Sequence, residues 1–92
     1  MIDHAAAADA WIQANPNVMH RLEQFALAAK ETGRTKLGIG LLIERVRWYE
    51  SVEKRDALFK INNNHRAYIA RHLMKHSPRL DGFFDLRRAG DE

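Results

Sequence analysis

The sequence contains no cysteine, and this absence excludes two ways of holding a small protein together. Neither a disulfide bond nor a thiolate metal site can form within its 92 residues. A chain of this length is expected to form one domain with a modest core. Packing alone must therefore stabilise the fold, and the lack of cysteine is typical of a reducing compartment.

Long apolar runs and familiar catalytic motifs are also missing. No run approaches the roughly 20 residues that cross a bilayer, and the N-terminus has no cationic region followed by an apolar core. We therefore expect a soluble, cytoplasmic protein. The sequence has no Gly-rich phosphate loop, nucleophile elbow or paired-carboxylate site, so it predicts neither an enzyme nor a bound cofactor.

Positive charge is concentrated in the second half of the chain, although the net charge is only +3. Residues 1–33 carry two Lys or Arg and four Asp or Glu, a net of −2. Residues 34–88 carry thirteen Lys or Arg and six Asp or Glu, a net of +7, and Asp91 and Glu92 add −2. The basic half is therefore expected to meet phosphates or an acidic protein surface.

Capping residues and apolar spacing predict three helices before residue 51. Asp3 can cap a short first helix, and Asn15-Pro16 both ends it and begins a second helix that stops at Gly33. The second and third helices each carry an apolar stripe at three- and four-residue spacing. The stripes consist of Val18, Met19, Leu22, Phe25, Ala26 and Ala29 in the second helix and Ile39, Leu42, Ile43, Val46 and Tyr49 in the third.

Two short strands are predicted in the second half of the chain. Residues 51–57 are charged and aperiodic, which is typical of an exposed loop, whereas residues 58–61 and 82–87 are typical of strands. We expect these strands to pair as a small ribbon packed on the helices. The predicted fold class is therefore mainly α (α+β), a compact helical domain of about four helices with a two-stranded β ribbon. It comprises a short helix at 1–15, a core at 16–88 and a tail at 89–92.

Residues 64–76 form the fourth predicted helix, which follows three asparagines and ends at Ser77-Pro78. On a helical wheel its apolar side consists of Ala67, Ile69, Ala70, Leu73 and Met74. Its polar side carries Asn64, His65, Tyr68, Arg71, His72, Lys75 and His76. Arg66 falls among the apolar positions, so its guanidinium must reach the edge or pair with an acid, such as one of the third helix.

The polar side of this helix predicts a nucleic-acid contact, because it combines phosphate-binding cations with side chains that can bond base edges. The first hypothesis is therefore a small protein that binds nucleic acid, and duplex DNA in particular. Its contact residues would be Asn64, His65, Tyr68, Arg71, His72 and Lys75, with flanking phosphates on Lys60, Arg79, Arg87 and Arg88. The alternative is a solvated basic face, and for the asparagines alone we favour capping of the helix.

Three histidines, His65, His72 and His76, share one sector of the wheel. The last two are four residues apart, a spacing that can bind a transition metal. No acid accompanies them, because neither Asp nor Glu occurs between Asp56 and Asp81. We therefore expect phosphate contact or simple solvation rather than a metal site.

An unusual run, Lys60-Ile61-Asn62-Asn63-Asn64, lies between the segments 42–48 and 67–71 and is followed by Gly82-Phe83-Phe84. Together these strings resemble a family of small phage and prophage proteins of uncharacterised function. The resemblance implies a phage-related source and assigns no activity to any residue.

The predicted order of elements also resembles a helix-turn-helix or winged-helix variant. Residues 64–76 would then be the recognition helix, and the terminal strand would belong to a wing. One difference is that residues 51–62 separate the last two helices, where a standard motif has a turn of about three or four residues. This likeness concerns the fold alone.

The second hypothesis is a protein-binding module of phage origin that needs no nucleic acid. It would engage a host or virion protein, or form a homodimer. Its candidate residues are Leu27, which lies off the apolar stripe of its helix, and Leu41 and Trp48, which lie opposite the stripe of the third helix. For Leu41 and Trp48 we favour cover by a neighbouring loop or strand over a partner surface.

Overall fold

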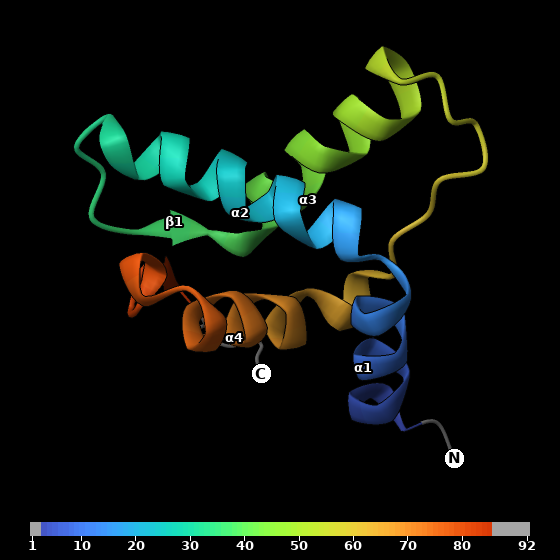
Figure 1. Ribbon diagram of the computed structural model, residues 1–92, viewed down its shortest axis with the longest axis horizontal. Helices are drawn as coiled ribbons and strands as arrows, with labels where there is room; N and C mark the ends of the chain where they lie inside the picture. Colours follow the sequence, from blue (N-terminus) through green and yellow to red (C-terminus); the bar gives the residue numbers. More distant parts are fainter. Residues whose placement is uncertain (1–2, 86–92) are drawn as a thin grey trace.

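The computed structural model describes residues 3–85, which form four α-helices, three short helical turns of other types and two short strands (Figure 1). In chain order the elements are α1 (His4–Ala14), α2 (Pro16–Glu31), β1 (Leu37–Gly38), α3 (Ile39–Trp48), the π-helix η1 (Tyr49–Glu53), the 3₁₀ turn η2 (Asn63–His65), α4 (Arg66–His76), the 3₁₀ turn η3 (Pro78–Leu80) and β2 (Phe84–Asp85). The prediction of a mainly helical domain with four helices and a two-stranded sheet is confirmed. No helix within the described range is long and apolar enough to cross a bilayer.

Local caps set the ends of the first two helices where the sequence predicts them. The Asp3 carboxylate accepts a hydrogen bond from the backbone N–H of Ala6 (3.0 Å), which satisfies a free donor in the first turn of α1. Pro16 opens α2, where its missing N–H costs no hydrogen bond. Beyond the end of α2, Gly33 adopts a φ of +99°, a conformation that glycine reaches without strain.

Helix α3 lies against both α2 and α4. The predicted apolar stripe is buried at Ile39, Leu42, Ile43 and Val46, whereas its last member, Tyr49, is half-buried and belongs to η1. Ile43 and Val46 of this stripe are fully buried. They join Leu22 of α2, Ile69 of α4 and Ile12 of α1 in one hydrophobic core. Burial of each such side chain contributes roughly 1.5–3 kcal/mol, so all four helices are held by the same apolar interior.

The predicted strand at residues 58–61 is wrong, whereas the C-terminal strand exists with a different partner. Strand β2 pairs in parallel with β1, and the N–H of Leu37 donates to the carbonyl of Phe83 at 2.9 Å. Residues 58–61 have no regular secondary structure. Ile61 is buried there and Phe59 is half-buried against the core. The apolar pattern of residues 58–61 therefore reflects the packing of these two side chains on the core and not the backbone hydrogen bonds of a strand.

The parallel pairing of β1 and β2 also contradicts the predicted wing. A wing is a hairpin of antiparallel strands, whereas β1 and β2 run parallel and are separated in the chain by α3 and α4. Helices α3 and α4 are joined by η1 and the chain from 54 to 62 rather than by a tight turn. The part of the chain that the structure describes is therefore a helical domain without winged-helix form.

The predicted loop at residues 51–57 is exposed as expected, but its first part is helical, because α3 continues into η1. Within η1, Glu50 points inward and is only 3 % exposed. Its carboxylate lies 3.6 Å from Nε of Arg21 and 3.4 Å from Nζ of Lys54, and these cations compensate the buried charge. A search for a 3.6-residue period cannot detect a π-helical turn, which has a different hydrogen-bond spacing.

The asparagine run caps the entry to α4 through Asn62. Its side chain accepts a hydrogen bond from the backbone N–H of Asn64 (2.8 Å) at the start of η2. We expect Asn62→Ala to lower the free energy of unfolding by about 1 kcal/mol, because that N–H loses its partner. Denaturation by urea measures the change.

The matched control for this cap is Asn64→Ala. The Asn64 side chain is exposed and makes no hydrogen bond within residues 3–85. Its removal should change the free energy of unfolding by less than about 0.5 kcal/mol. Equal losses in the two variants would contradict the assignment of the cap to Asn62.

Candidate nucleic-acid interface

Burial of its apolar side fixes which side chains of α4 reach solvent. Helix α4 packs against α1, α3 and η3, and Ile69 and Ala70 are fully buried. Arg71 and Lys75, one turn apart, are exposed on the opposite side. Tyr68 lies beside them and is half-buried.

Arg71 and Lys75 have no acidic partner within the described part of the chain. The cations that do form ion pairs there are Arg21, Arg45, Arg47, Lys54 and Arg79. The guanidinium carbon of Arg71 lies 5.6 Å from the centre of the Tyr68 ring, within the range of a cation–π contact. The charges of both side chains are therefore available to an external anion.

The polar side of the helix differs from the prediction because His65 and Arg66 exchange places. His65 is only 6 % exposed, and α1 packs against the turn η2 that contains it. Arg66 is exposed instead, and its Nε donates to the carbonyl of Asn63 at 3.1 Å. The sequence predicts α-helical winding from residue 64, whereas the turn η2 has about three residues per turn. His65 therefore lies off the exposed face on which the sequence placed it.

The remaining predicted contacts lie beyond the two ends of α4. Lys60 and Asn64 are exposed before the helix, and Arg79 is exposed after it in η3. The length of α4 therefore separates Lys60 and Asn64 from Arg79. Arg87 and Arg88, like the predicted tail at 89–92, lie outside the described residues.

The structure brings four predicted residues together around a hollow between α1 and α4. The volume of this hollow is about 220 Å³. The hollow is lined by Tyr68, Arg71, His72 and Lys75 from α4 and by Ala5, Asp9 and Ile12 from α1. It carries two cations against the single carboxylate of Asp9, so its lining has a net positive charge.

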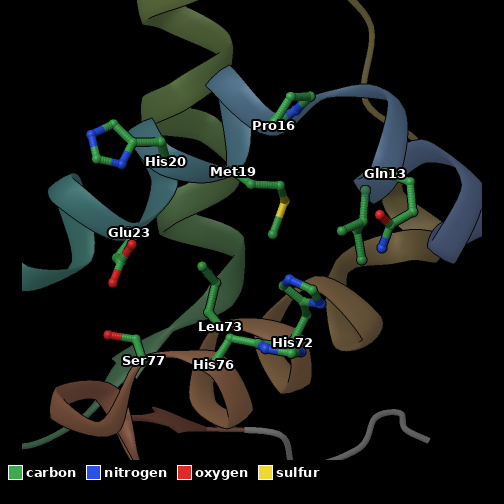
Figure 2. A pocket seen from close by; sticks show the side chains of 10 residues that line it. Gln13, Pro16, Met19, His20, Glu23, His72, Leu73, His76 and Ser77 are labelled. Atoms are coloured by element: carbon green, nitrogen blue, oxygen red, sulfur yellow. The ribbon is translucent and has the colours of Figure 1, made fainter.

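A second hollow, of about 350 Å³, shares Ile12 and His72 with the first (Figure 2). Figure 2 shows Met19, Leu73 and His72 around its centre, with His20 and Glu23 along one side. The full lining is Ile12, Gln13, Pro16, Met19, His20, Glu23, His72, Leu73, His76 and Ser77. Sequence analysis misses the contribution of α2, because no spacing along the chain relates Met19, His20 or Glu23 to α4.

Two of the three predicted histidines, His72 and His76, stack against each other. Their ring centres are 4.2 Å apart and their planes are inclined by 34°. Burial lowers the pKa of His72 below its ordinary value of 6.5, and His76 lowers it further. Asp9 acts in the opposite direction, and Lys75 adds a smaller decrease. Among residues 3–85, no group of three or more His, Asp or Glu side chains is placed to hold a metal ion.

The predicted cover over Leu41 and Trp48 is wrong, because these side chains are 62 % and 57 % exposed. Val52, four residues after Trp48 in the turn η1 that continues α3, is 49 % exposed. We call Leu41, Trp48 and Val52 the α3 stripe. Leu27, the other candidate of the second hypothesis, is half-buried and packs against the core.

Comparisons with known proteins find no family model, no curated protein and no solved structure that matches the chain. The likeness to small phage and prophage proteins therefore stays a prediction from the sequence.

The surroundings of His72 should make the stability of the protein depend on pH. Because the pKa of His72 is lower in the folded than in the unfolded chain, the unfolded chain binds more protons between the two values. The free energy of unfolding should therefore fall as the pH drops below 6.5 and the His72 contribution should level off below the folded pKa. His72→Gln is expected to remove this part of the loss, measured by urea denaturation at a series of pH values.

Two further variants test the causes of the shift. His76→Gln should raise the pKa of His72, because it removes a neighbouring cationic group, and Asp9→Asn should lower it, because it removes a neighbouring anion. Titration of the His72 ring protons by NMR measures both changes. A pKa that stays the same in both variants would contradict this arrangement of charges.

Proposed function

We propose that this chain is a small nucleic-acid-binding protein that uses the exposed side of α4. The observation that carries the proposal is the pair Arg71 and Lys75, which are exposed, one turn apart and without an ion pair within residues 3–85. Unpaired cations at this spacing bind phosphates and release the counterions condensed on them. That release supplies much of the affinity of proteins for nucleic acid.

The charge around α4 supports the same surface. No Asp or Glu occurs between Asp56 and Asp81, so the helix brings no acid of its own. Lys60 and Arg66 add exposed cations near its start. The charge that α4 itself carries therefore attracts a polyanion.

Side chains that can contact bases lie beside these cations. Tyr68 and His72 line the same hollow as Arg71 and Lys75, so a ligand held by its phosphates would place its bases near both rings. Asn64 is exposed at the start of the helix. The buried His65 takes no part in this surface. A phage or prophage setting, which the sequence resemblance implies, suits a small binding protein of this kind.

The double variant Arg71→Ala/Lys75→Ala tests the proposal. It should stay folded, because both side chains are exposed, and should bind short DNA much more weakly at low salt. The slope of log K against log salt concentration should become shallower by about two, one for each lost phosphate contact. Fluorescence anisotropy of labelled single-stranded and duplex DNA over a range of salt concentrations measures both effects.

The control for this experiment is Arg34→Ala/Arg55→Ala, which removes the same charge from two exposed residues outside α4. It should keep the salt dependence of the unchanged protein. Absence of binding to any DNA or RNA at low salt, or equal effects of the two double variants, would reject the proposed use of α4.

A second candidate function is protein binding through the α3 stripe. Its three apolar residues leave about half or more of their surface in water. Exposed tryptophan is the kind of anchor on which protein interfaces depend. A second copy of this chain or another protein would cover the stripe and remove its apolar surface from water.

Sedimentation velocity tests this second candidate. If the α3 stripe forms a homodimer, the sedimentation coefficient should rise with protein concentration. The variant Leu41→Ser/Trp48→Ser should stay monomeric at the same concentrations and remain folded, since both residues are exposed. A monomer at every concentration, together with no partner captured from host lysate, would reject protein binding through this stripe.

A further inference from the structure

The two hollows beside α4 are neighbours, because Ile12 and His72 line both of them. We call the two hollows together the α4 groove. Its walls come from α1 and α2 on one side and from α4 on the other. The groove therefore follows the helix that the proposed function assigns to nucleic acid.

The chemistry of the α4 groove changes along its length. One hollow has the cations Arg71 and Lys75, with Asp9 opposite. The other has an apolar floor of Met19 and Leu73 with imidazoles along the edge (Figure 2). A nucleotide likewise has one anionic part and one apolar part, since its phosphate is anionic and its base is a flat ring system with an apolar face.

The position of α1 disfavours a duplex as the ligand of this groove. Tyr68, Arg71, His72 and Lys75 share their hollow with residues of α1, so a ligand that reaches all four must pass close to α1. A major groove about 12 Å wide admits one helix, and a helix with its side chains is itself about 10–12 Å across. Two helices packed together do not fit, whereas an unpaired strand can enter the space between them.

The histidine pair provides a surface for an unstacked base. The ring centres of His72 and His76 are 4.2 Å apart, and His76 is exposed to solvent. Glu23 lies in the same hollow, where its carboxylate can accept a hydrogen bond from an exocyclic amino group of a base. The volume of about 350 Å³ is at the lower end of the range for ligand pockets and suits one ring system.

From these observations we infer that the α4 groove binds single-stranded nucleic acid. One phosphate lies on Arg71 and Lys75, and the attached base stacks on the histidine pair above Met19 and Leu73. This inference rests on the proposed function and narrows its ligand from nucleic acid in general to unpaired strands. In the bases of a duplex both faces are already stacked, so they cannot use these rings.

The test compares two substitutions of the exposed His76. His76→Ala removes the outer ring of the stack, whereas His76→Phe keeps a flat ring and removes the nitrogen atoms. The probes are a short fluorescein-labelled oligo-dC strand and a labelled DNA duplex of equal length, titrated at low salt with fluorescence anisotropy. Circular dichroism establishes that each variant is folded.

The unchanged protein should bind the single strand more tightly than the duplex. His76→Ala should weaken binding to the strand by at least about fivefold, the lower limit for loss of a base-stacking ring, and His76→Phe should retain most of the affinity. Neither substitution should alter the weaker duplex binding.

Binding of the duplex at least as tightly as the strand would overturn the inference and leave the proposed function standing. The inference would also be overturned if His76→Ala bound the strand with the affinity of the unchanged protein. It would be overturned as well if His76→Phe bound the strand as weakly as His76→Ala, because ring stacking would then contribute nothing. Absence of binding to both probes and to a labelled RNA strand would instead overturn the proposed function itself.

Discussion

The burial of one side of α4 is the constraint on which the rest of the molecule depends. Ile69, Ala70 and Leu73 are enclosed by α1, α3 and η3 together, and a rotation of the helix by one residue would expose apolar side chains and bury charged ones. This cost fixes the direction of Arg71 and Lys75, although no ion pair within the described chain holds either of them. Since no disulfide is available, packing alone presents the two charges to solvent.

The cations of α2 and α3 serve the scaffold, in contrast to those of α4. The guanidinium of Arg21 lies 4.0 Å from the centre of the Tyr49 ring, and that of Arg45 lies 4.3 Å from the centre of the Phe25 ring. The two rings meet edge to face with their centres 5.9 Å apart. Each of the two helices, α2 and α3–η1, therefore contributes one arginine that lies over an aromatic ring of the other. These contacts stabilise the packing between the two helices. Net charge alone cannot distinguish arginines that hold helices together from arginines that remain available to a ligand.

The range of each interaction decides how much of this structure the sequence predicts. Helix ends depend on local caps such as Asp3 and Asn62, so their positions follow from neighbouring residues, and the buried stripe of α3 follows from its period. The exchange of His65 and Arg66 depends on a 3₁₀ turn and on its cover by α1, which are not local. The partner of β2 is β1, far away in the chain, and the second hollow exists only because residues of α2 lie near α4. Fold class and the basic helix were therefore predictable, whereas strand pairing and the shape of the groove were not.

The pairing of β1 with β2 also sets the order in which the chain can complete its fold during synthesis. Phe83 and Phe84 are 2 % and 3 % exposed, and they join the core of residues contributed by all four helices. Helices form locally in less than about a microsecond, but this contact requires chain that leaves the ribosome much later than α1, α2 and α3. While those residues are still inside the ribosome, Leu37 lacks the carbonyl to which it donates in the folded state. The interior that the two phenylalanines close therefore stays open to water, and accessible to chaperones, until Phe83 and Phe84 have left the ribosome.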